Sequence, residues 1–87
     1  MKHYWMTYCN DGVELFNTEC PTRAAAIDEL KTAFRFDSEE SPVAAAYNDY
    51  YIEQYIETES EIITVNTEHF KLTIGKRGGI RCVKVSA

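Results

Sequence analysis

The chain begins with residues 2–9, which are rich in aromatic and β-prone types and predict a strand whose side chains alternate between two faces. In residues 2–9 the alternation separates two faces, with Tyr4, Met6 and Tyr8 on one and His3, Trp5, Thr7 and Cys9 on the other. Asn10-Asp11-Gly12 supplies turn chemistry, because Asn and Gly tolerate positive φ. A hairpin with a second strand over residues 13–18 is therefore predicted.

The C-terminal part of the chain has the same strand character. Residues 61–67 are rich in β-branched types, and residues 70–74 alternate between apolar and polar side chains. A glycine-rich turn at residues 75–79 then leads into residues 80–85. These segments predict three further strands.

The middle of the chain changes to helical spacing. Residues 23–36 gather their apolar side chains on one side of a helical wheel, which predicts an amphipathic helix. Ser41-Pro42 is typical of a helix start, and a second helix is predicted over residues 42–57. On that helix Asp49, Glu53 and Glu57 would form one acidic stripe at i, i+4 and i+8.

The order ββααβββ predicts a single α+β domain over residues 1–87, with a five-stranded antiparallel sheet carrying two helices on one face. No repeat or linker interrupts it. The expected core consists of large apolar and aromatic residues from every predicted element: Trp5, Leu15, Ile27, Leu30, Phe34, Tyr47, Tyr51, Ile52, Ile63, Val65, Leu72, Ile74 and Val83.

Charge is distributed unevenly along the sequence. The chain has a net charge of −5, but residues 37–61 alone carry −8 with no Lys or Arg, and residues 62–87 carry +4. Four of the six tyrosines also fall in residues 37–61. An acidic surface attracts basic partners, and tyrosine is favoured at interfaces because it combines a large apolar body with a polar tip.

The first functional hypothesis is a non-enzymatic binding protein that uses this acidic segment to occupy a basic surface of a protein partner, such as a nucleic-acid-binding groove. The short length, acidic segment and absence of catalytic motifs resemble small inhibitor proteins of phages and mobile elements in general character. The opposing interpretation is a solvated helix face. The candidate partner-binding residues are Asp37, Glu39, Glu40, Asp49, Tyr50, Glu53, Glu57 and Glu59.

The alternative is a small nucleic-acid-binding or regulatory module that uses the basic C-terminal hairpin. The turn lacks the GxxxxGK[ST] order of a P-loop, and a solubilising hairpin explains it equally well. Cationic side chains that could contact phosphates are Lys71, Lys76, Arg77, Arg81 and Lys84.

Cysteine and histidine positions give no catalytic or metal-binding pattern. Cys9, Cys20 and Cys82 form no CxxC pair, and no nucleophile motif or HExxH is present. Cys20 beside His3 is the one nucleophile–base pair that the predicted hairpin brings together. We therefore expect no enzyme activity, no metal and no cofactor.

Three cysteines without a framework spacing favour free thiols in a reducing compartment, so the expected location is the cytoplasm. No apolar run approaches the roughly 20 residues that span a bilayer, so no membrane partner is expected. We expect a monomer or a weak dimer, and residues 80–85 are the edge strand that would most readily pair with its own copy.

Overall fold

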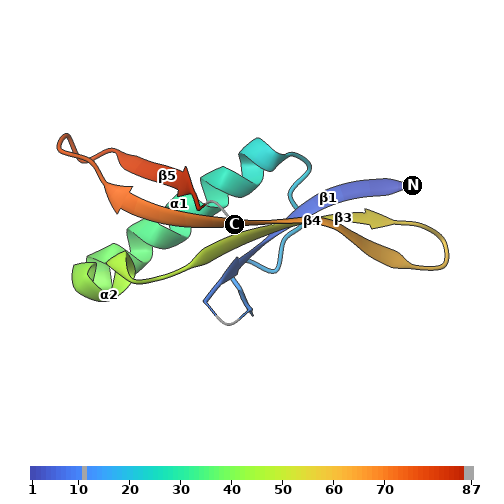
Figure 1. The fold of residues 1–87 in the computed structure, drawn as a ribbon, viewed down its shortest axis with the longest axis horizontal. Coiled ribbons are helices and arrows are strands. Elements are labelled where there is room, and N and C mark those ends of the chain that lie inside the picture. Colours follow the sequence, from blue (N-terminus) through green and yellow to red (C-terminus); the bar gives the residue numbers. More distant parts are fainter. Residues whose placement is uncertain (11, 86–87) are drawn as a thin grey trace.

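The computed structural model describes residues 1–10 and 12–85, and its elements run in the order ββααβββ (Figure 1). Five strands form one antiparallel sheet in the order β2-β1-β3-β4-β5, so the predicted α+β class and element order are confirmed. The bounds are β1 Lys2–Cys9, β2 Val13–Glu14, α1 Arg23–Glu40, α2 Pro42–Ala46, β3 Tyr50–Glu57, β4 Ile62–Ile74 and β5 Ile80–Lys84.

The first turn and second strand differ from the prediction in length. Asn10 and Gly12 both have positive φ, at 49° and 90°, as a tight turn requires, while the predicted turn residue Asp11 lies outside the described residues. β2 ends at Glu14. Beyond it the chain stays beside β1 through the Leu15 N to Thr7 O hydrogen bond of 3.0 Å and a bridge between Trp5 and Cys20.

Helix α1 covers one face of the sheet. The Thr22 side chain caps it by accepting a 3.1 Å hydrogen bond from the Ala25 N–H, and the helix continues past the predicted end to Glu40. Its buried side chains pack against strand residues on the face of the sheet that α1 covers. Helix and sheet therefore share one hydrophobic core. The core includes Ala26, Leu30, Ala33, Phe34, Tyr50, Ile52, Phe70 and Leu72.

The second predicted helix is wrong over most of its length. Helix α2 ends at Ala46, and residues 50–57 form the central strand β3 instead. The alternation of Tyr50 and Ile52 with Tyr51 and Glu53 is a period-two pattern, and Tyr and Ile favour strands. Residues 43–57 also fit helical spacing, so a helical wheel did not reveal the period-two pattern of the strand.

The two predicted strands at 61–67 and 70–74 are one continuous strand, β4. With its partner β3 it forms a long hairpin that extends beyond the start of α1, at the side of Figure 1 where the N-terminus lies. Ile63 and Val65 lie on this extension and are 44% and 49% exposed, so their assignment to the core is wrong.

Three more residues of the expected core are exposed, namely Tyr47, Ile74 and Val83, and Tyr51 is only half-buried. Trp5, Leu15 and Ile27 pack at the edge of the core, and Leu30, Phe34, Ile52 and Leu72 are fully within it. No helix in the described part of the chain is long and apolar enough to cross a membrane.

Candidate functional site

The face of the sheet opposite α1 carries tyrosine hydroxyl groups gathered around one carboxylate. Side chains alternate between the two faces of a strand, and Tyr50 and Ile52 point toward the helix. The intervening residues of β3, and the residues paired with them in β1 and β4, therefore point away from it. We call this surface the tyrosine face and define it by Tyr8, Tyr51, Glu53, Tyr55 and Thr67.

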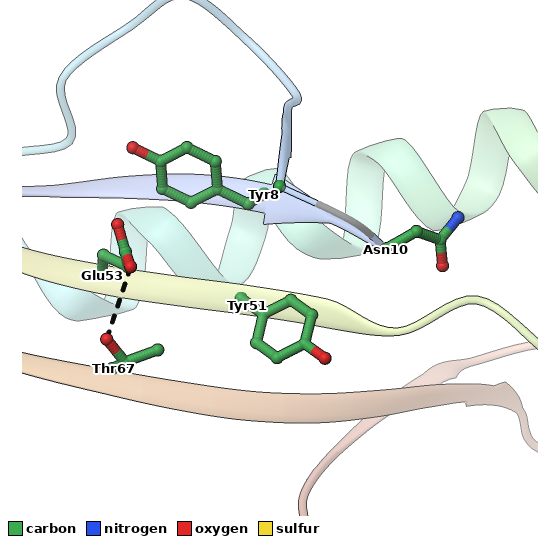
Figure 2. Close-up of a pocket in the computed structure, with 6 residues that line it drawn as sticks. Tyr8, Asn10, Tyr51, Glu53 and Thr67 are labelled. Carbon is green, nitrogen blue, oxygen red and sulfur yellow. Dashed lines mark hydrogen bonds between the residues drawn. The ribbon is translucent and has the colours of Figure 1, made fainter.

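Figure 2 shows this surface with α1 behind the sheet and the side chains in front. Strand pairing brings its members together, because Tyr8 lies opposite Tyr51 and Glu53 lies opposite Thr67. A shallow depression of about 450 Å³ lies among them and reaches the first turn at Asn10 and Gly12.

Glu53 is the carboxylate at the centre of this face. Its Oε1 accepts a hydrogen bond of 3.4 Å from the Thr67 hydroxyl, and its Oε2 accepts one from the Tyr55 hydroxyl. The Tyr8 and Tyr55 hydroxyl oxygens are 2.8 Å apart. These bonds fix the carboxylate and leave acceptor sites unused, since a carboxylate has about four lone-pair positions.

The aromatic rings around Glu53 are also held in place. Tyr55 packs on Tyr4 with a 5.4 Å centroid separation, and Tyr51 stacks on His69 at 4.6 Å with an interplanar angle of 15°. Burial, followed by the hydrogen bond to Glu53, raises the pKa of Tyr55. The site therefore combines a positioned anion with rings whose orientations are already set.

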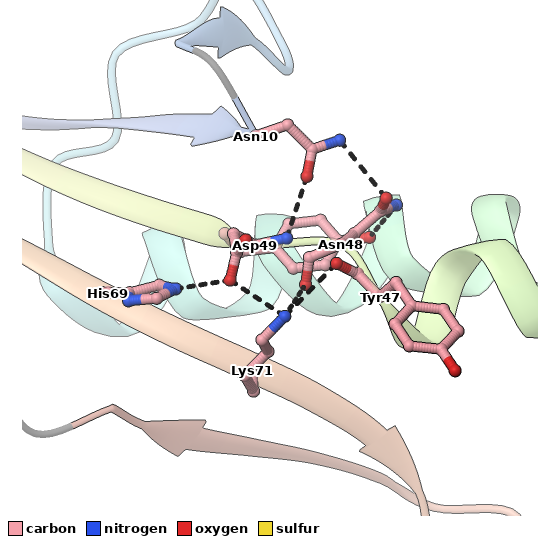
Figure 3. Close-up of polar contacts among 7 residues, drawn as sticks. Asn10, Tyr47, Asn48, Asp49, His69 and Lys71 are labelled. Atoms are coloured by element: carbon pink, nitrogen blue, oxygen red, sulfur yellow. Dashed lines mark hydrogen bonds and ion pairs between the residues drawn. The ribbon is translucent and has the colours of Figure 1, made fainter.

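A second polar cluster lies beside the tyrosine face, where β3 begins (Figure 3). Asp49 Oδ1 lies 2.7 Å from His69 Nε2 and 2.9 Å from Lys71 Nζ. These hydrogen bonds, that of Lys71 first, lower the pKa of Asp49. Lys71 also donates 3.3 Å hydrogen bonds to the carbonyls of Tyr47 and Asn48. The cluster ties the start of β3 to β4, which is a structural task.

The predicted partner-binding residues do not form the single helix stripe that their spacing indicated. They fall in three places: the end of α1 with Asp37, Glu39 and Glu40; strand β3 and the residue before it with Asp49, Tyr50, Glu53 and Glu57; and the β3–β4 turn with Glu59.

Three of these residues are engaged within the protein: Asp49 is held by His69 and Lys71, and Asp37 and Tyr50 bond to each other. Tyr50 is fully buried, and its hydroxyl donates a 2.9 Å hydrogen bond to Asp37 Oδ2. Burial raises the pKa of Tyr50. Tyr50 is therefore removed from the candidate surface, and Glu53 and Glu57 remain on the face that α1 leaves open.

Of the tyrosine face, the predicted partner-binding residues included only Glu53. The sequence did not single out Tyr8, Tyr55 and Thr67 for the site, and it assigned Tyr51 to the core. The alternation in residues 2–9 did place Tyr8 on a common face with Tyr4, and that grouping is correct. The pairing of Tyr8 with β3 was not predicted, because residues 50–57 were assigned to a helix.

The basic residues of the alternative hypothesis are also divided. Lys71 is held by Asp49, and Lys84 lies 3.4 Å from Glu68. Lys76 and Arg77 lie in the exposed β4–β5 turn, and Arg81 is exposed on β5. Two of the five predicted phosphate contacts are therefore already occupied by carboxylates.

The thiols give no support to a nucleophilic site. Cys9 and Cys20 are buried free cysteines, and Cys82 is a half-buried one. Burial, with a hydrogen bond to Glu29 as the second cause, raises the pKa of Cys20 to about 12. Among the described residues, no group of three or more His, Cys, Asp or Glu side chains is arranged to hold a metal ion.

Searches of protein-family models, of curated proteins and of solved structures found no match to this chain.

Proposed function

We propose that this chain is a small non-enzymatic binding protein, of inhibitor type, that captures a basic surface of a protein partner on its tyrosine face. The observation that supports this proposal is the position of Glu53. Its carboxylate is fixed by two hydroxyl groups at the floor of a depression lined by Tyr8 and Tyr51, on the face opposite α1.

The chemistry of the depression suits an arginine or lysine side chain. A guanidinium group can donate hydrogen bonds to the free acceptor positions of Glu53 while it lies against a tyrosine ring. Aromatic residues with fixed rings lose little conformational entropy on binding, and they are enriched among residues that dominate interface energetics. Asn10, at the rim of the depression, is held by its own hydrogen bonds to Asn48 and to the Asp49 N–H, which fixes the first turn beside the depression (Figure 3).

The distribution of charge supports a basic partner. Glu53 and Glu57 lie on β3, and Glu59 and Glu61 extend the negative charge to the tip of the β3–β4 hairpin. Such a field raises the rate of encounter with a positively charged surface, and this effect weakens as salt screens it. A nucleic-acid-binding protein presents a surface of this kind, and occupation of that surface would inhibit it.

The test uses arginine methyl ester as a minimal probe in an NMR titration of the purified protein. We expect weak saturable binding, with the ring resonances of Tyr8 and Tyr51 shifting most. Glu53→Gln should abolish the saturable shifts, because a neutral amide loses the charge and half of the acceptor capacity.

Glu40→Gln is the matched control, because it removes one negative charge from an exposed residue at the end of α1. It should leave the shifts of Tyr8 and Tyr51 unchanged. If both variants lost the saturable shifts equally, net charge and not the position of Glu53 would explain the binding. The absence of any saturable shift in the unaltered protein would reject the proposal.

A further inference from the structure

Strand β4 has an open edge over its first half. On one side β4 pairs with β3 from Ile62 to Phe70, but on the other side β5 pairs with it only from Phe70 to Ile74. Within residues 1–10 and 12–85, no strand lies beside Ile62–Asn66 on that outer side.

The composition of this edge favours pairing. The segment contains no charged residue and no proline, which are the devices that usually protect an exposed edge. Three of its residues, Ile62, Ile63 and Val65, are apolar and β-branched, with exposed fractions of 59%, 44% and 49%. β5, by contrast, carries Arg81 and Lys84.

The direction of the backbone groups along the edge follows from the hairpin. Thr58 N donates a 2.9 Å hydrogen bond to Glu61 O, so the polar groups of Glu61 point toward β3. In an antiparallel ladder the direction of the backbone groups alternates from residue to residue. The N–H and C=O groups of Ile63 therefore point toward β3, and those of Ile62 and Thr64 point toward the open edge. Two N–H and two C=O groups of this short edge are therefore available to another strand.

We propose that this edge pairs with the same edge of a second copy of the chain, antiparallel and centred on Ile63. A twofold axis there lets Ile62 and Thr64 exchange hydrogen bonds with Thr64 and Ile62 of the other copy. Ile63 meets its own counterpart, and because Ile63 lies opposite Ile56 in the hairpin, the two copies join their apolar pairs into one strip.

Charge favours this arrangement of the copies. Each hairpin tip, with Glu59 and Glu61, runs antiparallel along the other copy toward the end of its β5. The Lys84 side chain lies at that end of β5 and is 60% exposed, so it adds positive charge near the acidic tip although it also lies 3.4 Å from Glu68 of its own chain.

This contact is short compared with standard interfaces, so the dimer should be weak and dependent on concentration. The pairing uses Ile62–Thr64 and leaves the tyrosine-face residues on β1 and β3 accessible, among them Glu53, so it does not depend on the proposed function.

Sedimentation equilibrium from low micromolar to near-millimolar protein tests the pairing. We expect the mass to rise from the 10.0 kDa of the chain toward twice that value. Thr64→Pro removes an outward N–H without affecting the ladder to β3, and it should keep the protein monomeric. Thr64→Val keeps the N–H and a β-branched side chain, and it should dimerise as before. A mass that stays at that of one chain, or dimerisation of Thr64→Pro equal to that of Thr64→Val, would overturn the proposal.

A cysteine variant tests the register independently, in case Thr64→Pro folds poorly. Residues directly opposite each other in a non-hydrogen-bonded antiparallel pair have Cα atoms about 4.5 Å apart, which a disulfide can join. Ile63→Cys should therefore form a disulfide-linked dimer under mild oxidation. Ile74→Cys, at an apolar position of the same strand with 54% exposure, is the matched control and should not. Equal cross-linking of both variants, or none of Ile63→Cys, would contradict a pairing centred on Ile63.

Discussion

Arg23, the first residue of α1, holds Glu68 in the middle of β4 through two parallel hydrogen bonds, Nε to Oε1 at 2.7 Å and Nη2 to Oε2 at 2.8 Å. Glu68 is 7% exposed, and Arg23 also lies over the Phe70 ring. The pair joins the start of the helix to the sheet that it covers.

This pair predicts a loss of stability in acid. The Arg23 hydrogen bond, and to a smaller extent the charge of Lys84, lowers the pKa of Glu68 below its ordinary value. A carboxyl group whose pKa is depressed by folding stabilises the protein above its unfolded-state pKa, and this stabilisation is lost as the pH falls through the folded-state pKa. Thermal unfolding followed from neutral pH into the acid range should show this decline.

Glu68→Gln should be less stable than the unaltered protein at neutral pH by about 1.5–3 kcal/mol, the range for hydrogen bonds to charged groups. It should also lose part of the acid dependence. Glu39→Gln, at an exposed residue of α1, is the control and should keep both. An unchanged pH profile in Glu68→Gln would show that the ion pair adds no stability.

Two isoleucines that sequence reasoning assigned to one core should behave differently. Ile52 is 1% exposed beneath α1, whereas Ile63 is 44% exposed on the hairpin extension. Ile52→Ala should cost about 2–5 kcal/mol, because it removes buried methyl groups and leaves a cavity. Ile63→Ala, measured by urea denaturation at the same low protein concentration, should cost much less. Equal losses would mean that the extension is packed as tightly as the core.

The sequence was sufficient for the fold class but not for the partner of each strand. The β-prone composition of residues 2–9 identified β1, and the one-sided apolar spacing of residues 23–36 identified α1. Residues 50–57 satisfied both helical and strand spacing, and only the presence of two neighbouring strands decides between them. The predicted order was still correct because two errors offset each other: one helix was too long, and one strand was divided in two.

The candidate site was only partly predictable for the same reason. The acidic and tyrosine-rich composition of residues 37–61 did point to Glu53 and Glu57. Their neighbours Tyr8 and Thr67 come from β1 and β4, and no local pattern links them to Glu53. Tyr50 shows the opposite failure, because composition alone could not separate a buried tyrosine from its exposed neighbours.

The cysteines should differ in reactivity according to burial. Cys20 is 3% exposed and its pKa is raised to about 12, so it stays protonated at neutral pH. Burial also raises the pKa of Cys9, which is 8% exposed, and that of Cys82. Because Cys82 is the half-buried one, a thiol-specific reagent should label it first, as peptide mass spectrometry can show. In denaturant all three should react alike. Labelling of Cys20 before Cys82 in the folded protein would contradict this order.

Alkaline pH should unfold the protein through its buried tyrosines. Burial is the main cause of a raised pKa at Tyr4, Tyr50 and Tyr55, and for Tyr55 the hydrogen bond to Glu53 adds to it. A group whose pKa is raised by folding stabilises the protein below its unfolded-state pKa, about 10 for tyrosine, and this stabilisation is lost as the pH rises further. Absorbance of tyrosinate and far-ultraviolet circular dichroism should therefore change together in strong base. Glu53→Gln removes the negative charge beside Tyr55, so the ionisation of that tyrosine should begin at lower pH, whereas Glu40→Gln should leave it in place. If all six tyrosines titrated together near their ordinary pKa without unfolding, the hydroxyl–carboxylate network on the tyrosine face would not exist in solution.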